Sequence, residues 1–212
     1  MSALTFSVLG ARPEPHAAAP QLALRIRVAE SSGVAVHAIT LRAQVRIEPQ
    51  GRTYGDDDAV RLVELFGGRE RYGDTLRSLL WTHVSQTVLA FSGETEFDLA
   101  IPCSYDFEVA AHKYLNALRD GEIPLVLMFS GTVFVRSAEG VATELVPWSC
   151  EARYRLPVAV WRATMDAHFP NSAWIRVDRD TFDELARFKA AGGFPTWESA
   201  IERLCADAKS AR

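Results

Sequence analysis

A cysteine just before a predicted helix is the residue of this chain best placed for covalent chemistry. Cys103 follows Pro102 and precedes a segment, from about Tyr105, whose apolar residues recur at helical spacing. The positive end of a helix dipole lowers the pKa of a nearby thiol, so Cys103 is a candidate nucleophile. Such a nucleophile also needs a base, and one of the five histidines would have to supply it. The alternative is a buried thiol that behaves as a small apolar side chain.

Histidine and carboxylate side chains offer one weak candidate for metal binding. Glu108 and His112 lie four residues apart in the predicted helix, so they share a face and could provide two ligands. A zinc or iron site needs further nitrogen or sulfur ligands, and the chain contains neither Cys-x-x-Cys nor His-x-x-x-His. Phosphate-loop, dinucleotide-binding and Gly-x-Ser-x-Gly patterns are absent as well. The sequence therefore predicts no metal site, no cofactor and no assigned catalytic residue.

Arginines recur on the polar side of two predicted strands. Residues 21–28 and 39–48 alternate between apolar and polar side chains, which is typical of strands with one solvent-facing side. Residues 31–33 (Ser-Ser-Gly) suit a turn, so we expect the two strands to pair as a hairpin. The polar face of this hairpin would carry four arginines, which are Arg25, Arg27, Arg42 and Arg46.

Such a cationic stripe could bind an acidic protein or a phosphate group. The alternative is that carboxylates on outward positions of neighbouring strands neutralise it, namely Glu48, Glu96 and Asp98. Only the strand order can decide between these two interpretations.

Four tryptophans, Trp148, Trp161, Trp174 and Trp197, gather in the last third of the chain. Aromatic side chains at this density commonly fill an interface between helices and a sheet. An exposed cluster would instead be a docking surface for a protein. In that second interpretation Trp174 and Trp197 are the candidate partner-binding residues.

The elements that position these residues are mostly strands, followed by helices. Further strands are expected at residues 4–9, 80–91, 95–101, 123–136, 142–146 and 151–156. Residues 123–136 are apolar on both faces, which indicates a central strand covered on both sides, whereas 151–156 alternate, with Glu151, Arg153 and Arg155 on one face. Helices are expected at residues 56–66, 105–118, 158–168, 181–190 and 197–208, with Asp180 and Thr196 as caps of the last two.

This order of elements predicts an α+β protein. Its core would be an antiparallel β-sheet or β-sandwich with an inserted short helix and a mid-chain helix. Residues 1–157 would form the β-rich domain, and residues 158–212 a C-terminal helical segment packed on the same domain.

Composition narrows the classes of function. The chain has 212 residues, of which 48% are hydrophobic and 24% charged, and a formal net charge of −4. An acidic balance disfavours nucleic acid as a partner. The longest apolar stretch is too short to span a bilayer, and the three cysteines imply no disulfide framework. We therefore expect a cytoplasmic protein without membrane insertion.

Several segments together resemble a known group of sequences. They are residues 13–20 (PEPHAAAP), 129–134 (FSGTVF), 154–161 (YRLPVAVW) and 195–197 (PTW). They are similar to an uncharacterised bacterial family of unknown function found near genes for high-affinity nickel–iron hydrogenases. The resemblance implies an accessory role beside the hydrogenase and its maturation proteins. A fainter resemblance, carried by residues 121–125 (GEIPL) after strands and a helix, is to SecB-type export chaperones.

These observations favour a non-enzymatic accessory protein that binds another protein, such as a hydrogenase subunit or maturation factor. One alternative is a SecB-like chaperone that binds unfolded chains. Another is a small enzyme with Cys103 as its nucleophile. A homo-oligomer that pairs through exposed strand edges is a further possibility.

Overall fold

A computed structural model describes residues 3–104, 109–137, 140–172 and 175–210 of the chain. The chain divides into two compact units, Met1–Ala173 and Trp174–Arg212. The described residues contain eight β-strands and six α-helices, and the pairing of the strands is antiparallel throughout. The predicted α+β class and antiparallel β core are therefore confirmed.

Three strands form the smaller sheet of the first unit, in the order β1-β2-β5. They span Leu4–Pro13, Gln21–Glu30 and Glu94–Pro102. The strand β1 runs further than the expected residues 4–9 and ends on Pro13. Proline is tolerated there because β1 is an edge strand of its sheet, where a missing N–H breaks no ladder.

Five strands form the larger sheet, in the order β4-β3-β6-β7, with β8 also paired to β6. They are β3 (Val36–Ile47), β4 (Leu79–Val88), β6 (Glu122–Ser137), β7 (Gly140–Leu145) and β8 (Glu151–Pro157). The long strand β6 pairs with β7 near its end and with β8 near its start. The last two strands thus follow one path along β6, interrupted by the loop at residues 146–150.

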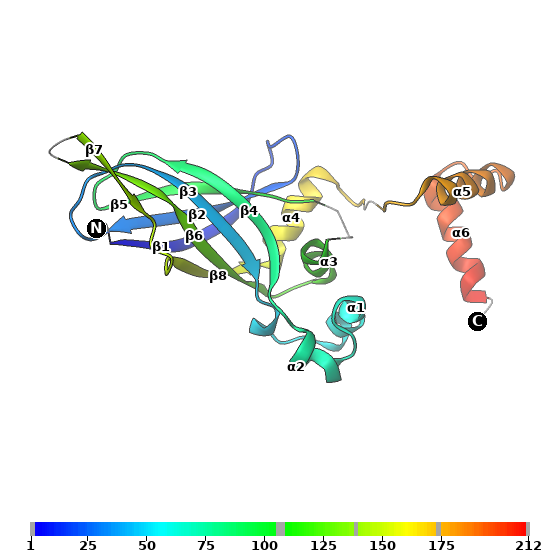
Figure 1. The fold of residues 1–212 in the computed structure, drawn as a ribbon. Helices are drawn as coiled ribbons and strands as arrows, with labels where there is room; N and C mark the ends of the chain where they lie inside the picture. The colour runs from blue at the N-terminus through cyan, green and yellow to red at the C-terminus, as the bar shows by residue number, and fades with distance from the viewer. Residues whose placement is uncertain (1–2, 105–108, 138–139, 173–174, 211–212) are drawn as a thin grey trace. The chain divides into compact units, whose positions relative to one another are not determined.

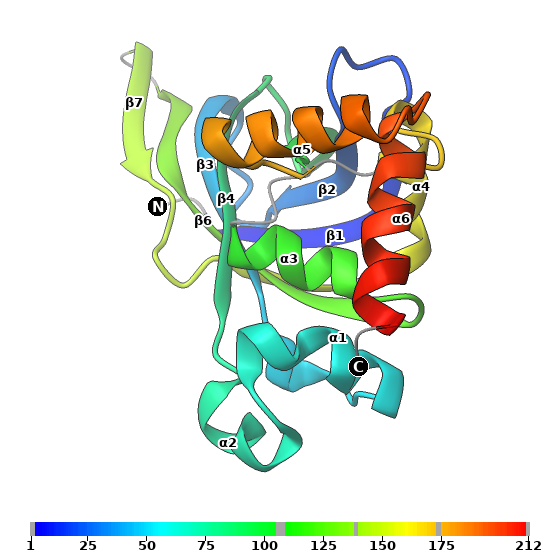
Figure 2. The same ribbon diagram turned by 90° about the vertical axis from the view of Figure 1, so that its right-hand side faces the viewer.

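The two sheets face each other and enclose one hydrophobic core (Figures 1 and 2). The rings of Phe6 on β1 and Phe129 on β6 stack across the core with centroids 4.2 Å apart. The edge strand β1 lies beside β8, and β4 lies beside β5. The architecture is therefore a β-sandwich, one of the two forms of antiparallel core that the sequence left open.

Helices occupy one end of the sandwich. The connection from β3 to β4 forms the 3₁₀ turn η1 (Pro49–Gly51), helix α1 (Asp56–Phe66), a second 3₁₀ turn η2 (Arg69–Arg71) and the short helix α2 (Tyr72–Thr75). Helix α3 (Ala110–Ala117) packs on α1 and β4, and α4 (Val158–His168) packs on β1 and β2. Figure 2 shows α3 and α4 in front of the strands when the sandwich is viewed along its length.

One glycine in β6 allows β3 to approach closely. Gly131 has φ +143°, and a Cβ on it would lie 2.0 Å from the carbonyl oxygen of Thr40. Any side chain would therefore collide with backbone, in a conformation that L-residues rarely adopt. The pairing of β3 with β6 depends on glycine at this position.

The second unit is a pair of helices, α5 (Arg179–Ala191) and α6 (Trp197–Ser210). Their caps are Asp178, whose side chain accepts from the backbone N–H of Thr181, and Thr196, whose hydroxyl accepts from Ser199 N–H. The cap at Thr196 was expected, whereas the prediction of Asp180 as a cap is wrong because Asp180 lies inside the first turn of α5.

Two predictions about the sandwich are wrong. The strands β2 and β3 do not form a hairpin, because β2 pairs with β1 and β5 while β3 pairs with β4 and β6. The strand β6 is covered on one side only, and Met128 on its outer side is 41% exposed. Outside the sandwich, the sequence also predicts a short strand at residues 173–177, and its described part, residues 175–177, forms none.

Two further predicted boundaries concern the start of the mid-chain helix and the end of the β-rich domain. The described part of the mid-chain helix starts at Ala110, and residues 105–108 lie outside the described residues. The expected boundary at Pro157 precedes α4, a helix of the first unit. For α5 and α6, packing on the β-rich domain stays a prediction.

Candidate functional site

The outer face of the five-stranded sheet is exposed at residues of three neighbouring strands, which are Arg42, Met128 and Arg153. Its side chains follow from the register of β3, β6 and β8. Val126 of β6 lies opposite Arg46 of β3 on one side and opposite Arg153 of β8 on the other. In the next row Met128 lies between Gln44 and Glu151. An apolar strip along β6 is thus flanked by polar and charged side chains from both neighbouring strands.

This surface is hollowed into a groove of about 670 Å³. Apolar residues of β6, chiefly Pro124, Val126 and Met128, line its floor. Charged residues line the sides of this sheet groove, namely Arg46 and Glu48 on one side and Glu151, Arg153 and Arg155 on the other. A wide, open groove of this composition is typical of a surface that binds a chain segment.

A second cavity, of about 950 Å³, adjoins the sheet groove and shares Gln50, Gly51 and Arg155 with it. We call it the η1 pocket, because η1 and the start of α1 form one wall and the α3–β6 connection forms another. Arginines and carboxylates alternate around it, including Arg119, Asp120 and Glu122. The sheet groove and the η1 pocket together form the candidate site.

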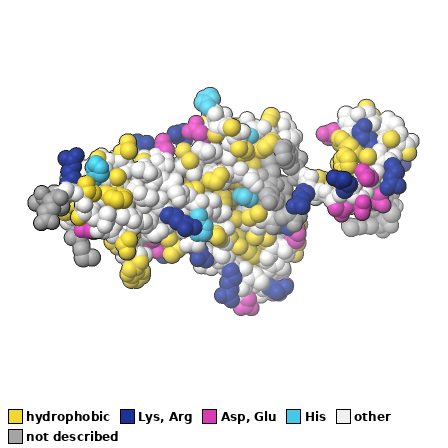
Figure 3. Space-filling model, turned by 45° about the horizontal axis from the view of Figure 1, so that its top comes forward, with side chains coloured by type: hydrophobic (Ala, Val, Ile, Leu, Met, Phe, Trp, Pro, Cys, Tyr) yellow, Lys and Arg dark blue, Asp and Glu magenta, His cyan; other side chains and the backbone are white. Residues whose placement is uncertain are grey.

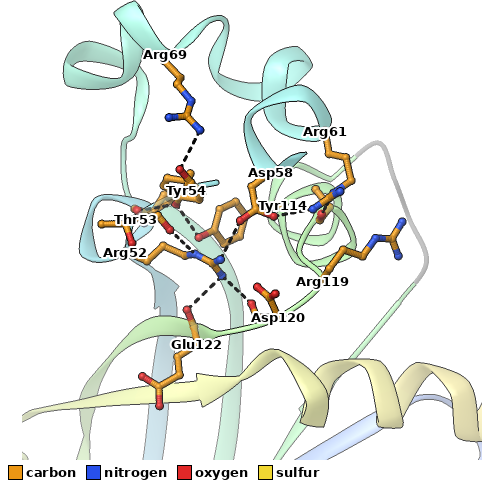
Figure 4. Close-up of polar contacts among 12 residues, drawn as sticks. Arg52, Thr53, Tyr54, Asp58, Arg61, Arg69, Tyr114, Arg119, Asp120 and Glu122 are labelled. Carbon is orange, nitrogen blue, oxygen red and sulfur yellow. Dashed lines mark hydrogen bonds and ion pairs between the residues drawn. The ribbon is translucent and has the colours of Figure 1, made fainter. Parts of the chain in front are cut away.

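A buried ion-pair network holds the wall of the η1 pocket (Figure 4). The side chains of Arg52 and Asp58 are each 9% exposed and lie 3.1 Å apart, between Arg52 Nη2 and Asp58 Oδ2. The other oxygen of Asp58 lies 2.7 Å from Nη2 of Arg61. Nη1 of Arg52 also donates to the carbonyl oxygens of Asp120 and Glu122, at 3.3 and 3.4 Å. The network therefore ties α1 to the start of β6.

Two tyrosines behind this network share a hydrogen bond of 2.8 Å between their hydroxyl oxygens. The hydroxyl of Tyr54 also donates to the carbonyl oxygen of Pro49 at 2.6 Å, so the hydroxyl of Tyr114 donates to Tyr54. Burial raises the pKa of both phenols, that of Tyr114 to about 12. Both keep their protons at neutral pH, and their role is to position residues 49–54.

The four predicted arginines are divided between the two sheets. Arg25 and Arg27 lie on the three-stranded sheet, and Arg42 and Arg46 lie on the outer face of the five-stranded sheet. The single stripe that the hairpin implied is therefore not formed.

Carboxylates of β5 neutralise the half of the set that lies on the three-stranded sheet. Glu96 lies 3.1 Å from Arg25 and 2.7 Å from Arg27, and Asp98 lies 3.4 Å from Arg25 and 3.1 Å from Arg12. Hydrogen bonds from the two guanidinium groups lower the pKa of Glu96. We call these ion pairs of Arg12, Arg25 and Arg27 with Glu96 and Asp98 the charge ladder. They agree with the interpretation in which Glu96 and Asp98 neutralise the arginines. Arg42, in contrast, is exposed and forms no ion pair with any residue that the structure describes.

The environment of Cys103 is the opposite of what a nucleophile needs. The residue is 6% exposed, and its thiol faces the carbonyl oxygen of Ile101 at 3.5 Å. Burial raises the pKa of the thiol to about 12. The described helix α3 begins seven residues later, and His112 stacks on Trp161 with ring centroids 6.2 Å apart. The structure thus favours the alternative interpretation, a small apolar residue of the core.

The three tryptophans that the structure describes in the last third of the chain differ in their surroundings. Trp161 is 1% exposed in the core, where its ring meets Trp81 edge-on at 5.9 Å. Trp148, in the loop between β7 and β8, is 93% exposed. Trp197 is 38% exposed in the second unit and lies 5.3 Å from the ring of Phe182. Trp174 and Glu108 lie outside the described residues.

The exposed apolar side chains occur in small groups among charged ones, as the face drawn in Figure 3 shows. On the second unit, Phe182, Trp197 and Ile201 are all more than one-third exposed, and Ala200 is its one buried hydrophobic residue among those described. No set of three or more His, Cys, Asp and Glu side chains is arranged to hold a metal ion within the described part of the chain. No helix among the described residues has the length and apolar character to cross a membrane.

Sequence reasoning placed Arg153 and Arg155 on the outer side of a strand but did not associate them with Arg42 and Arg46. The period-two pattern showed which way each side chain points. The missing information was that β6 separates β3 from β8, which no local pattern carries.

The fold and the site define a β-sandwich protein with an open, charged groove on one sheet and a separate pair of helices. The chain belongs to DUF6084, a family of unknown function, which it matches over residues 1–212. No curated protein matches it.

Solved structures resemble the chain only distantly. One is the putative ApaA protein from Bordetella pertussis, 14% identical, with a TM-score of 0.33 over 73% of this chain and 93% of that one. Another is the CARDB domain of the PF1109 protein from Pyrococcus furiosus, 11% identical, with a TM-score of 0.29 over 74% of this chain and 92% of that one.

Proposed function

We propose that this protein is a non-enzymatic accessory or assembly protein that binds another protein through the sheet groove. The observation that carries the proposal is the apolar floor of β6, exposed at Met128 and bordered by charged residues of β3 and β8. An antiparallel sheet that faces water usually presents polar side chains. Apolar side chains within a polar rim are instead the common arrangement of protein interfaces.

The chemistry of the site supports binding over catalysis. The two tyrosines behind the η1 pocket keep their protons, and the thiol of Cys103, which lies outside the site, is buried with a raised pKa. Arg52 and Arg61 in the pocket wall are bound to Asp58 and to backbone carbonyls. These groups fix the shape of the site and offer neither a nucleophile nor a general base at neutral pH.

A nickel–iron hydrogenase subunit or one of its maturation factors is the partner we propose. The support for this partner is the sequence resemblance described above, and its location would be the cytoplasm. Binding of unfolded chains in the manner of SecB-type chaperones is the second candidate, supported by the open, sheet-built groove with apolar floor.

Affinity purification of the tagged full chain from its own host, grown on hydrogen, tests the proposal. The eluates are quantified by mass spectrometry for the wild type, for Met128→Asp in the groove, and for Thr87→Asp as an exposed control on β4. We expect hydrogenase components with the wild type and with Thr87→Asp, and at least about fivefold less with Met128→Asp.

The outcome of this experiment distinguishes between the candidate functions. Equal recovery of partners with all three proteins would exclude the groove as the binding surface, and no hydrogenase component in any eluate would exclude the proposed partner. Heterogeneous unfolded proteins, lost with Met128→Asp, would favour the chaperone. Light scattering of the purified chain tests for a homo-oligomer.

A further inference from the structure

The side chains that flank the apolar floor have an unequal charge. Three arginines line the groove, Arg46, Arg153 and Arg155, against two glutamates, Glu48 and Glu151, so the lining has one more arginine than glutamates. Beyond the lining, the same face carries Arg42 on β3 and Glu122 on β6, whose charges offset each other. Glu48 accepts a hydrogen bond from Ser78 at 2.5 Å and another from Gln50 at 3.1 Å. The negative charge of Glu48 is therefore partly satisfied by hydrogen bonds within the groove itself. The groove is cationic, although the whole chain has a net charge of −4.

The arginines of the rim have few carboxylate partners. The contact of Arg153 with Glu151 is 3.4 Å long, and the Arg153 side chain is 78% exposed. Arg155 lies 3.9 Å from Glu122, and Arg46 donates to the hydroxyl of Ser78 at 2.8 Å. Exposed ion pairs of this length contribute little, so these guanidinium groups remain available to carboxylates of a ligand.

The floor has the repeat of an extended chain. Val126 and Met128 are two residues apart on β6 and point to the same side, about 6.8 Å from each other. Arg46 and Arg153 lie in the row of Val126, one strand away on either side and therefore about 9.6 Å apart. A β-strand-like segment above β6 would place every second side chain on the floor. Arginine side chains are long enough to rise on both sides of such a segment.

We infer that the sheet groove binds an extended acidic segment of a partner protein, in which apolar side chains alternate with carboxylates. This inference rests on the proposed function and specifies the partner's binding motif. The apolar side chains contact Val126 and Met128, and the carboxylates pair with Arg46 and Arg153. The charge ladder of the three-stranded sheet offers no equivalent, because its arginines already have carboxylate partners.

Fluorescence anisotropy of labelled peptides tests the inference on the full chain. The probe is fluorescein-Gly-Asp-Leu-Glu-Val-Asp-Leu-Glu, and the control probe carries lysine at each acidic position. The variants are Arg153→Glu, Arg46→Glu and, as a matched change of charge on α4, Arg162→Glu. Circular dichroism of each variant verifies that it is folded.

We expect saturable binding of the acidic probe to the wild type and to Arg162→Glu, and weaker binding at higher salt. Arg153→Glu should raise the dissociation constant at least about fivefold, because reversal of the charge replaces an attraction by a repulsion. The lysine probe should not bind.

Equal affinity for the acidic and lysine probes, or equal affinity of wild type and Arg153→Glu for the acidic probe, would overturn the inference. Absence of binding by either probe would overturn it as well. The proposed function is judged separately, since Met128→Asp reports on a protein partner whatever the charge of its bound segment. A partner lost with Met128→Asp but retained with Arg153→Glu would leave the proposed function standing without the acidic motif.

Discussion

Removal of the Asp58 carboxylate should destabilise the first unit far more than removal of a neighbouring carboxylate in the same helical turn. Asp58 pairs with Arg52, whose side chain is 9% exposed, and with Arg61, whose side chain is 28% exposed. Its replacement leaves a buried guanidinium without its carboxylate. Asp57, in contrast, is exposed in the same first turn of α1 and serves as the control.

The magnitude follows from the partners that remain. Breaking a buried ion pair costs roughly 3–5 kcal/mol when the remaining charge has no other partner. Arg52 keeps three carbonyl acceptors at 3.3–3.4 Å, which lowers the cost, and loss of the partly exposed pair with Arg61 adds at most about 1 kcal/mol. We therefore expect Asp58→Ala to lower the free energy of unfolding by about 3 kcal/mol, and Asp57→Ala to lower it by less than about 1 kcal/mol.

The assay is urea unfolding at pH 7, followed by near-ultraviolet circular dichroism, which reports on the buried Trp81 and Trp161 of the first unit. The two variants are compared by their midpoints and slopes. Similar losses of stability for Asp58→Ala and Asp57→Ala would refute the reasoning, because the network would then be no more than a surface arrangement. Addition of Arg61→Ala in a double-mutant cycle measures the smaller pair directly.

Three further predictions concern the core and the loops. Glu30 is 4% exposed and accepts hydrogen bonds from Ser32 and from backbone N–H groups, which lower its pKa from 4.5 to about 2. The free energy of unfolding of the wild type should therefore fall by about 2 kcal/mol between pH 5 and pH 3, and urea titrations at each pH should show that Glu30→Gln lacks this part of the loss. In thermal or urea unfolding, Gly131→Ala should lower the free energy of unfolding by at least about 2 kcal/mol. Gly10→Ala should lower it by less than about 1 kcal/mol, because the space around its Cβ position is open. Iodoacetamide should label Cys103 more slowly than it labels the exposed Cys205 at pH 7.5, and equal rates measured by mass spectrometry would contradict its burial.

The sequence predicted the elements of the sandwich better than their arrangement. Alternation identifies a strand and its solvent-facing side, so the outward positions of Arg25 and Arg42 could be read from the pattern. Alternation does not identify a strand's partner. The turn-like residues 31–33 suggested a hairpin, but the chain crosses there from one sheet to the other.

The site escaped sequence analysis for a related reason. Residues 123–136 are apolar on both faces, which predicted burial on both sides. In the structure Met128 on the outer side is exposed and Val126 is only partly buried, because the helices of the first unit lie at one end of the sandwich and not over this face. An apolar strand can be central to a sheet and still form the floor of a groove.

The charge ladder on the three-stranded sheet has a consequence for how a partner would approach. Its alternating arginines and carboxylates cancel each other at short range, so that face exerts little field beyond about a Debye length. Within about a Debye length of the groove, an acidic chain then meets arginines of the five-stranded sheet that outnumber the glutamates of the lining. Attraction of this kind raises the rate of productive encounters and orients them, and salt slows association more than it speeds dissociation. If the groove binds an acidic chain as proposed, the carboxylates of β5 prevent Arg25 and Arg27 from forming a second surface that competes for it.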